Sequence, residues 1–129
     1  MPLDEDLRVF SGSPYEARFG FCRALRSGDR VLVAGTAPVW PDGSCDPDPA
    51  RQARRCCEII LAAMSELGAE ARQVVRTRMY ITDAADAEAI GRAHGDMLGG
   101  SSPVSTMVVV AGLVDARWKV EIEAEARLD

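Results

Sequence analysis

Polar side chains alternate with apolar ones in two segments of this sequence. Arg76, Arg78 and Tyr80 do so in the first segment, and Glu121 and Glu123 do so in the second. Because alternate residues of a β-strand share one face, each segment would direct these groups to a single face of a sheet. Guanidinium groups bind anions and also pair with carboxylates. This face could therefore bind a small anion or form ion pairs.

The other residues capable of chemistry are isolated in the sequence. His94 is the one histidine, and we expect it to fill a gap between a helix and a sheet or to face solvent. Ser105 is not predicted to be a nucleophile, because the sequence places no histidine or lysine base to activate it. The cysteines fit no metal-binding spacing and are expected to be free thiols; they are Cys22, Cys45, Cys56 and Cys57. The sequence therefore indicates neither a metal site nor a cofactor.

Hydrophobic periodicity defines the elements that must position these groups. We predict strands at 7–10, 19–25, 30–35, 74–82, 104–113 and 118–128. A long amphipathic helix should start at Asp48 and Pro49, run to Leu67 and end at Gly68. A second helix should follow the capping residues 83–86 and end at 99–100. Two helices can cover only one face of such a sheet.

The other face of the sheet needs a different cover. The residues predicted on it are Arg76, Arg78, Tyr80, Ser105, Met107, Val109, Glu121 and Glu123. This mixture of apolar and oppositely charged groups suits a subunit interface that contains polar clefts. A solvated antiparallel face is the alternative.

Length and composition limit the class of protein. The chain has 129 residues, 47% of them hydrophobic and 5% aromatic, and a formal net charge of -5. We therefore expect one domain, 1–129. The excess of acidic over basic residues and the small number of aromatic residues argue against nucleic-acid binding. No stretch is apolar enough to span a membrane, and the acidic start 1–6 does not resemble a secretory signal, so a cytoplasmic location is expected.

Several short strings, in their order and spacing, resemble the RidA family, also called YjgF/YER057c/UK114 or endoribonuclease L-PSP. They are SPY at 13–15, VAGTAP at 33–38, LGA at 67–69, VVRT at 74–77, YITD at 80–83, residues 103–113 and VEIEA at 120–124, together with Gln52. The resemblance spans nearly the whole chain. It implies an α+β, chorismate-mutase-like fold with one mixed sheet and two helices on one face. It also implies a homotrimer with small-molecule clefts between subunits.

The best-known activity of the family is the hydrolysis of enamines and imines to keto acids and ammonia. The resemblance matches Glu121 to a water-orienting acid, Gly35 to a glycine whose backbone lines the cleft, and Tyr15 to a cleft tyrosine. Three positions differ from the family. Ser105 occupies the place of the arginine that holds the substrate carboxylate, and Met107 that of a cleft cysteine. A cleft asparagine on the second helix is also absent, since residue 91 is glycine.

Because a hydroxyl cannot replace a bidentate guanidinium, the loss of the arginine means that the family's substrate cannot be assumed for this chain. One hypothesis is that Arg78 supplies the lost charge, and the alternative is that Arg78 pairs with Glu121 or Glu123. The predicted function is binding of a small metabolite in an intersubunit cleft, with hydrolytic deamination of an imine, enamine or related C=N compound. The alternative is a non-catalytic ligand-binding or sensing trimer. Ribonuclease activity fits the composition poorly.

Overall fold

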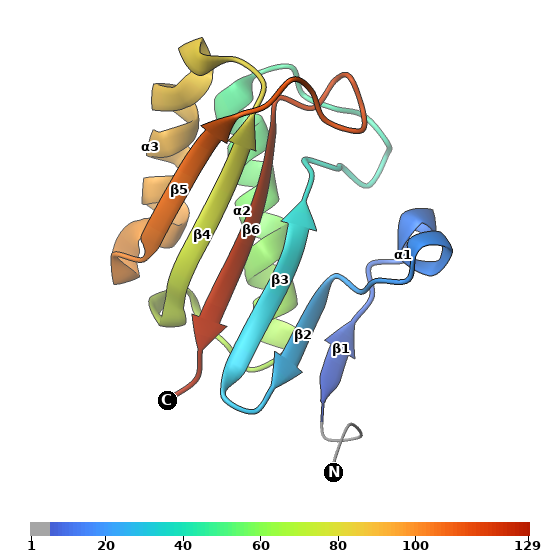
Figure 1. Cartoon of the computed structure of the whole chain (residues 1–129), viewed down its shortest axis with the longest axis vertical. Helices are drawn as coiled ribbons and strands as arrows, with labels where there is room; N and C mark the ends of the chain where they lie inside the picture. The colour runs from blue at the N-terminus through green and yellow to red at the C-terminus, as the bar shows by residue number, and fades with distance from the viewer. Residues whose placement is uncertain (1–5) are drawn as a thin grey trace.

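The computed structural model describes residues 6–129 and contains one six-stranded sheet (Figure 1). The acidic start of the chain, 1–5, lies outside the described residues. The strands are Leu7–Val9 (β1), Ala24–Ser27 (β2), Arg30–Thr36 (β3), Val74–Ile81 (β4), Val104–Val109 (β5) and Val120–Arg127 (β6). They lie in the order β1-β2-β3-β6-β4-β5. β4 and β5 are parallel and all other neighbours are antiparallel, so the sheet is mixed, as predicted.

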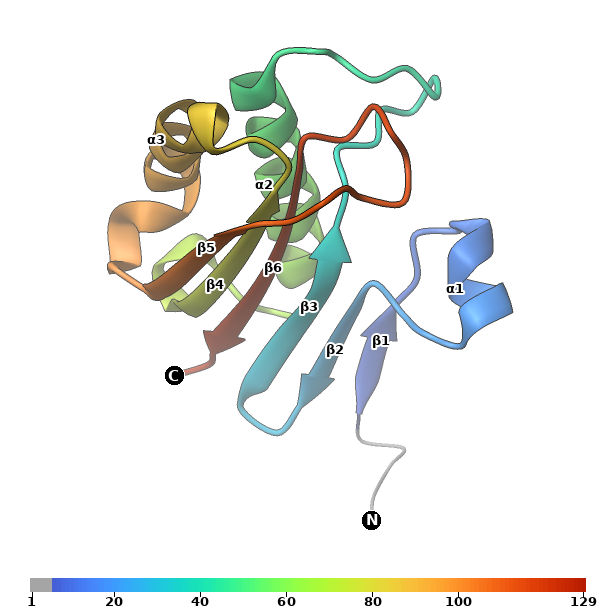
Figure 2. The ribbon, with the colours of Figure 1, turned by 45° about the horizontal axis from the view of Figure 1, so that its top comes forward.

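Two long helices, Pro49–Glu66 (α2) and Ala87–Leu98 (α3), cover one face of the sheet (Figures 1 and 2). The Asp48 side chain caps α2 by accepting a hydrogen bond from the Arg51 amide at 3.0 Å. The helix ends before Gly68, which has a φ of 85°. Single 3₁₀ turns lie at Ala71–Gln73, Ala84–Asp86 and Gly99–Ser101. The predicted arrangement of two helices on one face is therefore confirmed.

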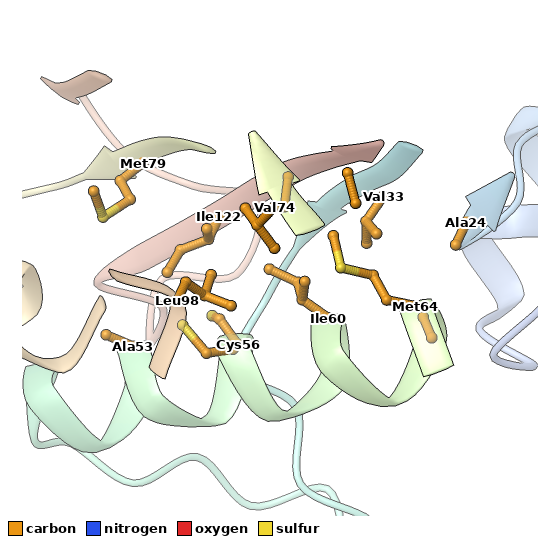
Figure 3. Packing of buried hydrophobic residues seen from close by; sticks show 14 of the residues in the cluster. Ala24, Val33, Ala53, Cys56, Ile60, Met64, Val74, Met79, Leu98 and Ile122 are labelled. Carbon is orange, nitrogen blue, oxygen red and sulfur yellow. The ribbon is translucent and has the colours of Figure 1, made fainter. Parts of the chain in front are cut away.

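The hydrophobic core lies between α2, α3 and the sheet (Figure 3). Ile60 and Met64 of α2 are fully buried against the apolar side of the central strand β6, which carries Ile122. Cys56 and Cys57 are buried in the same core, and all four cysteines are free thiols, as predicted. Within residues 6–129, no helix is both long and apolar enough to cross a membrane.

A third, short helix, which the sequence did not predict, precedes the predicted strand 19–25 and overlaps its first residue. Pro14–Phe19 forms α1, which stands apart from the other two helices (Figure 2). The Ser13 side chain accepts a hydrogen bond from the Tyr15 amide, and Gly20 ends the helix with a φ of 78°. These are ordinary cap signals. The predicted strand 19–25 is therefore wrong over 19–23, and β2 starts only at Ala24.

The edge strand β5 has the opposite phase to the one predicted. Because β5 runs parallel to β4, residues in register share a face, and Ser105 is in register with Thr77. Thr77 is buried beneath the helices. Ser105, Met107 and Val109 therefore lie on the helix-covered side of the sheet, and their predicted place on the uncovered face is wrong.

The uncovered face is otherwise as predicted from alternation. Arg78, Tyr80, Glu121 and Glu123 lie on it, because β4 and β6 pair in register and send their apolar residues to the helices. The alternation of β4 fails only at its start. A register shift between β4 and β6 at this point buries Val74 and leaves Val75 exposed.

Because Ile60 is fully buried in the core, we predict that truncating its side chain strongly destabilises the protein. Ile60→Ala should lower the free energy of unfolding by about 2–5 kcal/mol, because it removes buried methyl groups and leaves a cavity. Urea unfolding followed by circular dichroism measures this loss. Glu66→Ala, at an exposed position of the same helix, is the control and should change stability by less than about 0.5 kcal/mol. Equal effects of the two substitutions would contradict the packing described.

Candidate functional site

Glu121 and Gly35 lie side by side on the uncovered face. The pairing of β3 with β6 shifts register between Val33 and Thr36, which places Gly35 in a bulge. A Cβ atom at Gly35 would overlap Oε2 of Glu121. Glycine is therefore required here for space, so that the half-buried carboxylate can lie against the strand.

Arg23 and Glu16 hold this bulge in place. Nη1 of Arg23 donates hydrogen bonds to the Gly35 carbonyl oxygen at 2.8 Å and to Oγ1 of Thr36 at 3.1 Å. Nε of Arg23 lies 3.8 Å from Oε2 of the buried Glu16, which itself accepts a hydrogen bond from the Ser11 amide at 3.0 Å. Neither residue was predicted from the sequence. Glu16 lies three residues before the predicted strand 19–25 and Arg23 lies inside it, and no motif marks either position.

The surroundings of Glu121 change its acidity. Burial raises the pKa of the Glu121 carboxyl group, and the neighbouring charge of Glu123 raises it further, while the Arg23 guanidinium opposes both effects. A half-buried carboxyl group with a raised pKa is suited to exchange a proton with a bound molecule.

Arg78 forms an ion pair on the same face. Its Nη1 lies 3.2 Å from Oε2 of Glu123, and the Tyr80 hydroxyl donates a hydrogen bond to the same carboxylate. That hydrogen bond raises the pKa of Tyr80. The predicted pairing of Arg78 with Glu123 is therefore confirmed. The Arg78 side chain is still 45% exposed, and it lines a hollow of about 220 Å³ above β2, β3 and β6.

Ser105 and Met107 lie across the sheet from Glu121. Oγ of Ser105 accepts a hydrogen bond from Oγ1 of Thr77 at 2.7 Å, and Oγ1 of Thr77 lies 2.8 Å from Nε2 of His94. His94 is buried between α3 and the sheet, so it fills the gap that the sequence analysis expected. Met107 faces Gly91 of α3, where an added Cβ would lie 3.8 Å from the Met107 Cε.

Tyr15 lies on α1 and is 40% exposed. Its ring stacks on that of Phe19, with centroids 5.8 Å apart and an interplanar angle of 19°. The six residues predicted to form one site therefore occupy three places in a single chain. Gly35, Glu121 and Arg78 share the uncovered face, Ser105 and Met107 lie at the helix-covered edge, and Tyr15 lies on α1.

No metal centre accompanies these groups in the described part of the chain, since residues 6–129 bring no three His, Cys, Asp or Glu side chains together as possible ligands. The fold and the site together define a small α+β protein with one bare sheet face and a half-buried acid on it.

Comparison with known proteins places this chain within a family. Residues 12–128 match the family described as Endoribonuclease L-PSP. The chain is 41% identical over 120 residues to the protein SCO2049 of Streptomyces coelicolor, which covers 92% of this chain and 90% of the relative. The chain therefore belongs to the endoribonuclease L-PSP family, also called YjgF/YER057c/UK114 or RidA, as its sequence resemblance predicted.

Solved structures of the family share its fold. Rv2704 of Mycobacterium tuberculosis, a YjgF/YER057c/UK114 member, superposes with a TM-score of 0.87 at 37% identity, covering 95% of this chain and 99% of that one. TdcF of E. coli, whose structure contains bound serine, superposes with a TM-score of 0.80 at 25% identity, covering 95% and 94%.

The raised pKa of Glu121 predicts a pH-dependent gain in stability for Glu121→Gln. At a pH below the unfolded-state pKa, the Glu121 carboxyl is protonated in the folded and the unfolded state, and it does not change the free energy of unfolding. At a pH above the folded-state pKa, the half-buried carboxylate is charged and destabilises the folded state. The variant should therefore unfold at higher urea than the parent at pH 7–8, and the difference should shrink towards pH 4. Glu66→Gln, at an exposed position, should show no such trend. A loss of stability at pH 7–8 would mean that Arg23 outweighs burial.

Proposed function

We propose that this chain works as a homotrimer that binds a small metabolite in clefts between its subunits. The uncovered sheet face supports this proposal, because it combines exposed valines of β5 with the charged groups of β4 and β6. The separation of the predicted site residues supports it too. Residues on opposite faces of one sheet can meet only when a neighbouring subunit supplies one of the two groups.

The reaction that we propose in this cleft is hydrolytic deamination of an imine, enamine or related C=N compound. The single observation that carries it is the half-buried carboxyl of Glu121, which lies against Gly35 with a raised pKa. Glu121 would orient a water molecule and take its proton as the oxygen bonds to the imine carbon. The nitrogen gains protons, the C–N bond breaks, and ammonia leaves behind a carbonyl compound. Gly35 would offer backbone hydrogen bonds, and Tyr15 would close the pocket.

A relative of this chain supports small-molecule binding, since the E. coli TdcF structure contains bound serine. We place the trimer in the cytoplasm, because the chain carries four free thiols and reduced thiols persist there.

The second candidate function is ligand binding or sensing without catalysis. The observation that favours it is the environment of Ser105, whose hydroxyl is hydrogen-bonded to Thr77 and brings no positive charge to the cleft. Arg78, the candidate replacement for that charge, lies on the other face and is paired with Glu123. Within one subunit, Arg78 therefore does not compensate for the lost arginine, and only the Arg78 of a neighbouring subunit could.

The proposed assembly predicts that one charge on β5 will dissociate the trimer. The parent protein should elute with three times the 13.9 kDa chain mass in size-exclusion chromatography with light scattering. Val108→Asp, at a 42% exposed position on the uncovered face, should shift it to the monomer, because it buries an unpaired charge at the interface. Ala62→Asp, on the exposed side of α2, should leave the mass unchanged. A monomeric parent protein would contradict the assembly.

The proposed reaction predicts that an arginine restored at residue 105 increases hydrolysis of 2-aminoacrylate. A charge-assisted hydrogen bond to the substrate carboxylate contributes about 1.5–3 kcal/mol, so Ser105→Arg should raise kcat/KM at least about tenfold. Ammonia release is measured with 2-aminoacrylate generated in situ by a pyridoxal-phosphate-dependent dehydratase. Ala62→Arg, on the exposed side of α2 and away from the proposed interface, is the control and should give no gain. No gain with Ser105→Arg would favour the non-catalytic alternative.

A further inference from the structure

The three side chains Ser105, Thr77 and His94 form a continuous hydrogen-bonded chain from an exposed strand edge to a buried histidine. The Thr77 hydroxyl lies 2.7 Å from Oγ of Ser105 and 2.8 Å from Nε2 of His94. Thr77 and His94 are both buried, whereas Ser105 is exposed on the edge strand β5. These hydrogen bonds take no part in the ion pairs of the uncovered face or in the proposed action of Glu121.

The direction of these hydrogen bonds determines what Ser105 offers to a ligand. We assign the Thr77 hydroxyl proton to Ser105, and in this arrangement the Thr77 oxygen accepts the proton that Nε2 of His94 carries. Burial lowers the pKa of His94, so its imidazole is neutral at physiological pH. The Ser105 hydroxyl therefore already has a donor, and its own proton is free to point away from the sheet.

Within one subunit, the surroundings of Ser105 are uncharged. Thr77 and neutral His94 lie beneath it, and Met107 and Gly91 lie next along the strand and helix. The arginines of the neighbouring strand, Arg76 and Arg78, line the hollow on the opposite face. On α3, Arg92 pairs with Glu88 at 3.6 Å, and Asp96 pairs with Arg54 of α2 at 3.4 Å. A carboxylate placed at Ser105 would therefore lose water without gaining a cation from the same subunit.

We propose that the helix-side edge of β5 is a binding site for an uncharged hydrogen-bond acceptor, such as a carbonyl oxygen or an imine nitrogen. Ser105 donates to the ligand, and Thr77 and His94 are positioning residues that hold the Ser105 hydroxyl in this orientation. This inference rests on the proposed function and names its substrate class: a neutral imine or carbonyl compound in place of an amino-acid-derived carboxylate.

A binding titration with two matched probes tests the inference without requiring turnover. Pyruvamide and pyruvate differ in that one carries a neutral amide where the other carries a carboxylate. Each is added to the isotope-labelled protein, and NMR follows the backbone amides of β5 and the ring of His94. Pyruvamide should bind at least about tenfold more tightly than pyruvate and should shift Ser105, Thr77 and His94, because an unpaired carboxylate is costly to desolvate.

Substitutions separate the contact residue from the positioning residues. Ser105→Ala should weaken pyruvamide binding roughly three- to tenfold, as expected for one lost hydrogen bond. Thr77→Val should weaken it too and should abolish the shift of the His94 ring that pyruvamide causes in the parent protein, because the ligand is then no longer connected to His94 through a hydroxyl. Thr77→Ser, which keeps the hydroxyl, should restore both properties. Thr106→Ala removes a hydroxyl from the opposite face of β5 and should change neither.

Three results would overturn the inference: tighter binding of pyruvate, unchanged pyruvamide affinity in Ser105→Ala, or no shift at β5 up to the solubility limit of pyruvamide. Failure of the proposed function looks different. A protein that hydrolyses no imine but still prefers pyruvamide through Ser105 would refute the reaction and leave this site intact. A protein that releases ammonia from 2-aminoacrylate but does not bind pyruvamide more tightly than pyruvate would support the reaction and refute this site.

Discussion

The structure depends on the strict alternation of apolar and polar residues along β6, the strand at the centre of the sheet. Its apolar residues, such as Ile122, face α2 and are fully buried, while its glutamates face the other way. Because β6 pairs with both β3 and β4, this alternation assigns one apolar and one polar side to the whole central sheet. The helices cover the apolar side only. A half-buried carboxylate and a set of ion pairs on the bare side follow directly from this division.

The same division explains why Glu121 needs its particular neighbours. A carboxylate on the central strand is partly shielded by the strands on both sides, and burial raises its pKa. The bulge at Gly35 gives the carboxylate room, and Arg23 fixes the bulge while moderating the charge. Arg23 is in turn close to Glu16 of α1. The short helix that distinguishes the N-terminal region is therefore linked to the acid on the sheet through two side chains.

Much of the fold was predictable because its signals are local. The cap at Asp48, the stop at Gly68 and the alternation of residues 120–127 identified α2 and β6 correctly. The family resemblance added the sheet and its helices. The helix α1 was overlooked although Ser13, Pro14 and Gly20 are ordinary helix boundaries, since the turn signal of the Ser-Pro pair was given more weight than its capping role. The candidate site was predicted less well, since its residues come from distant parts of the chain.

The sequence by itself determined which strands have a polar side, because periodicity of two is visible wherever apolar and polar residues alternate. It could not determine the phase of β5, whose apolar run 104–113 shows no alternation. Only the parallel register with β4 decided that Ser105 lies with Thr77 and His94, on the side of the helices. The approach of Glu121 to Gly35 likewise depended on the pairing of β3 with β6, which lie far apart in the chain. Long-range pairing is a property of the folded sheet, and no local pattern of residues encodes it.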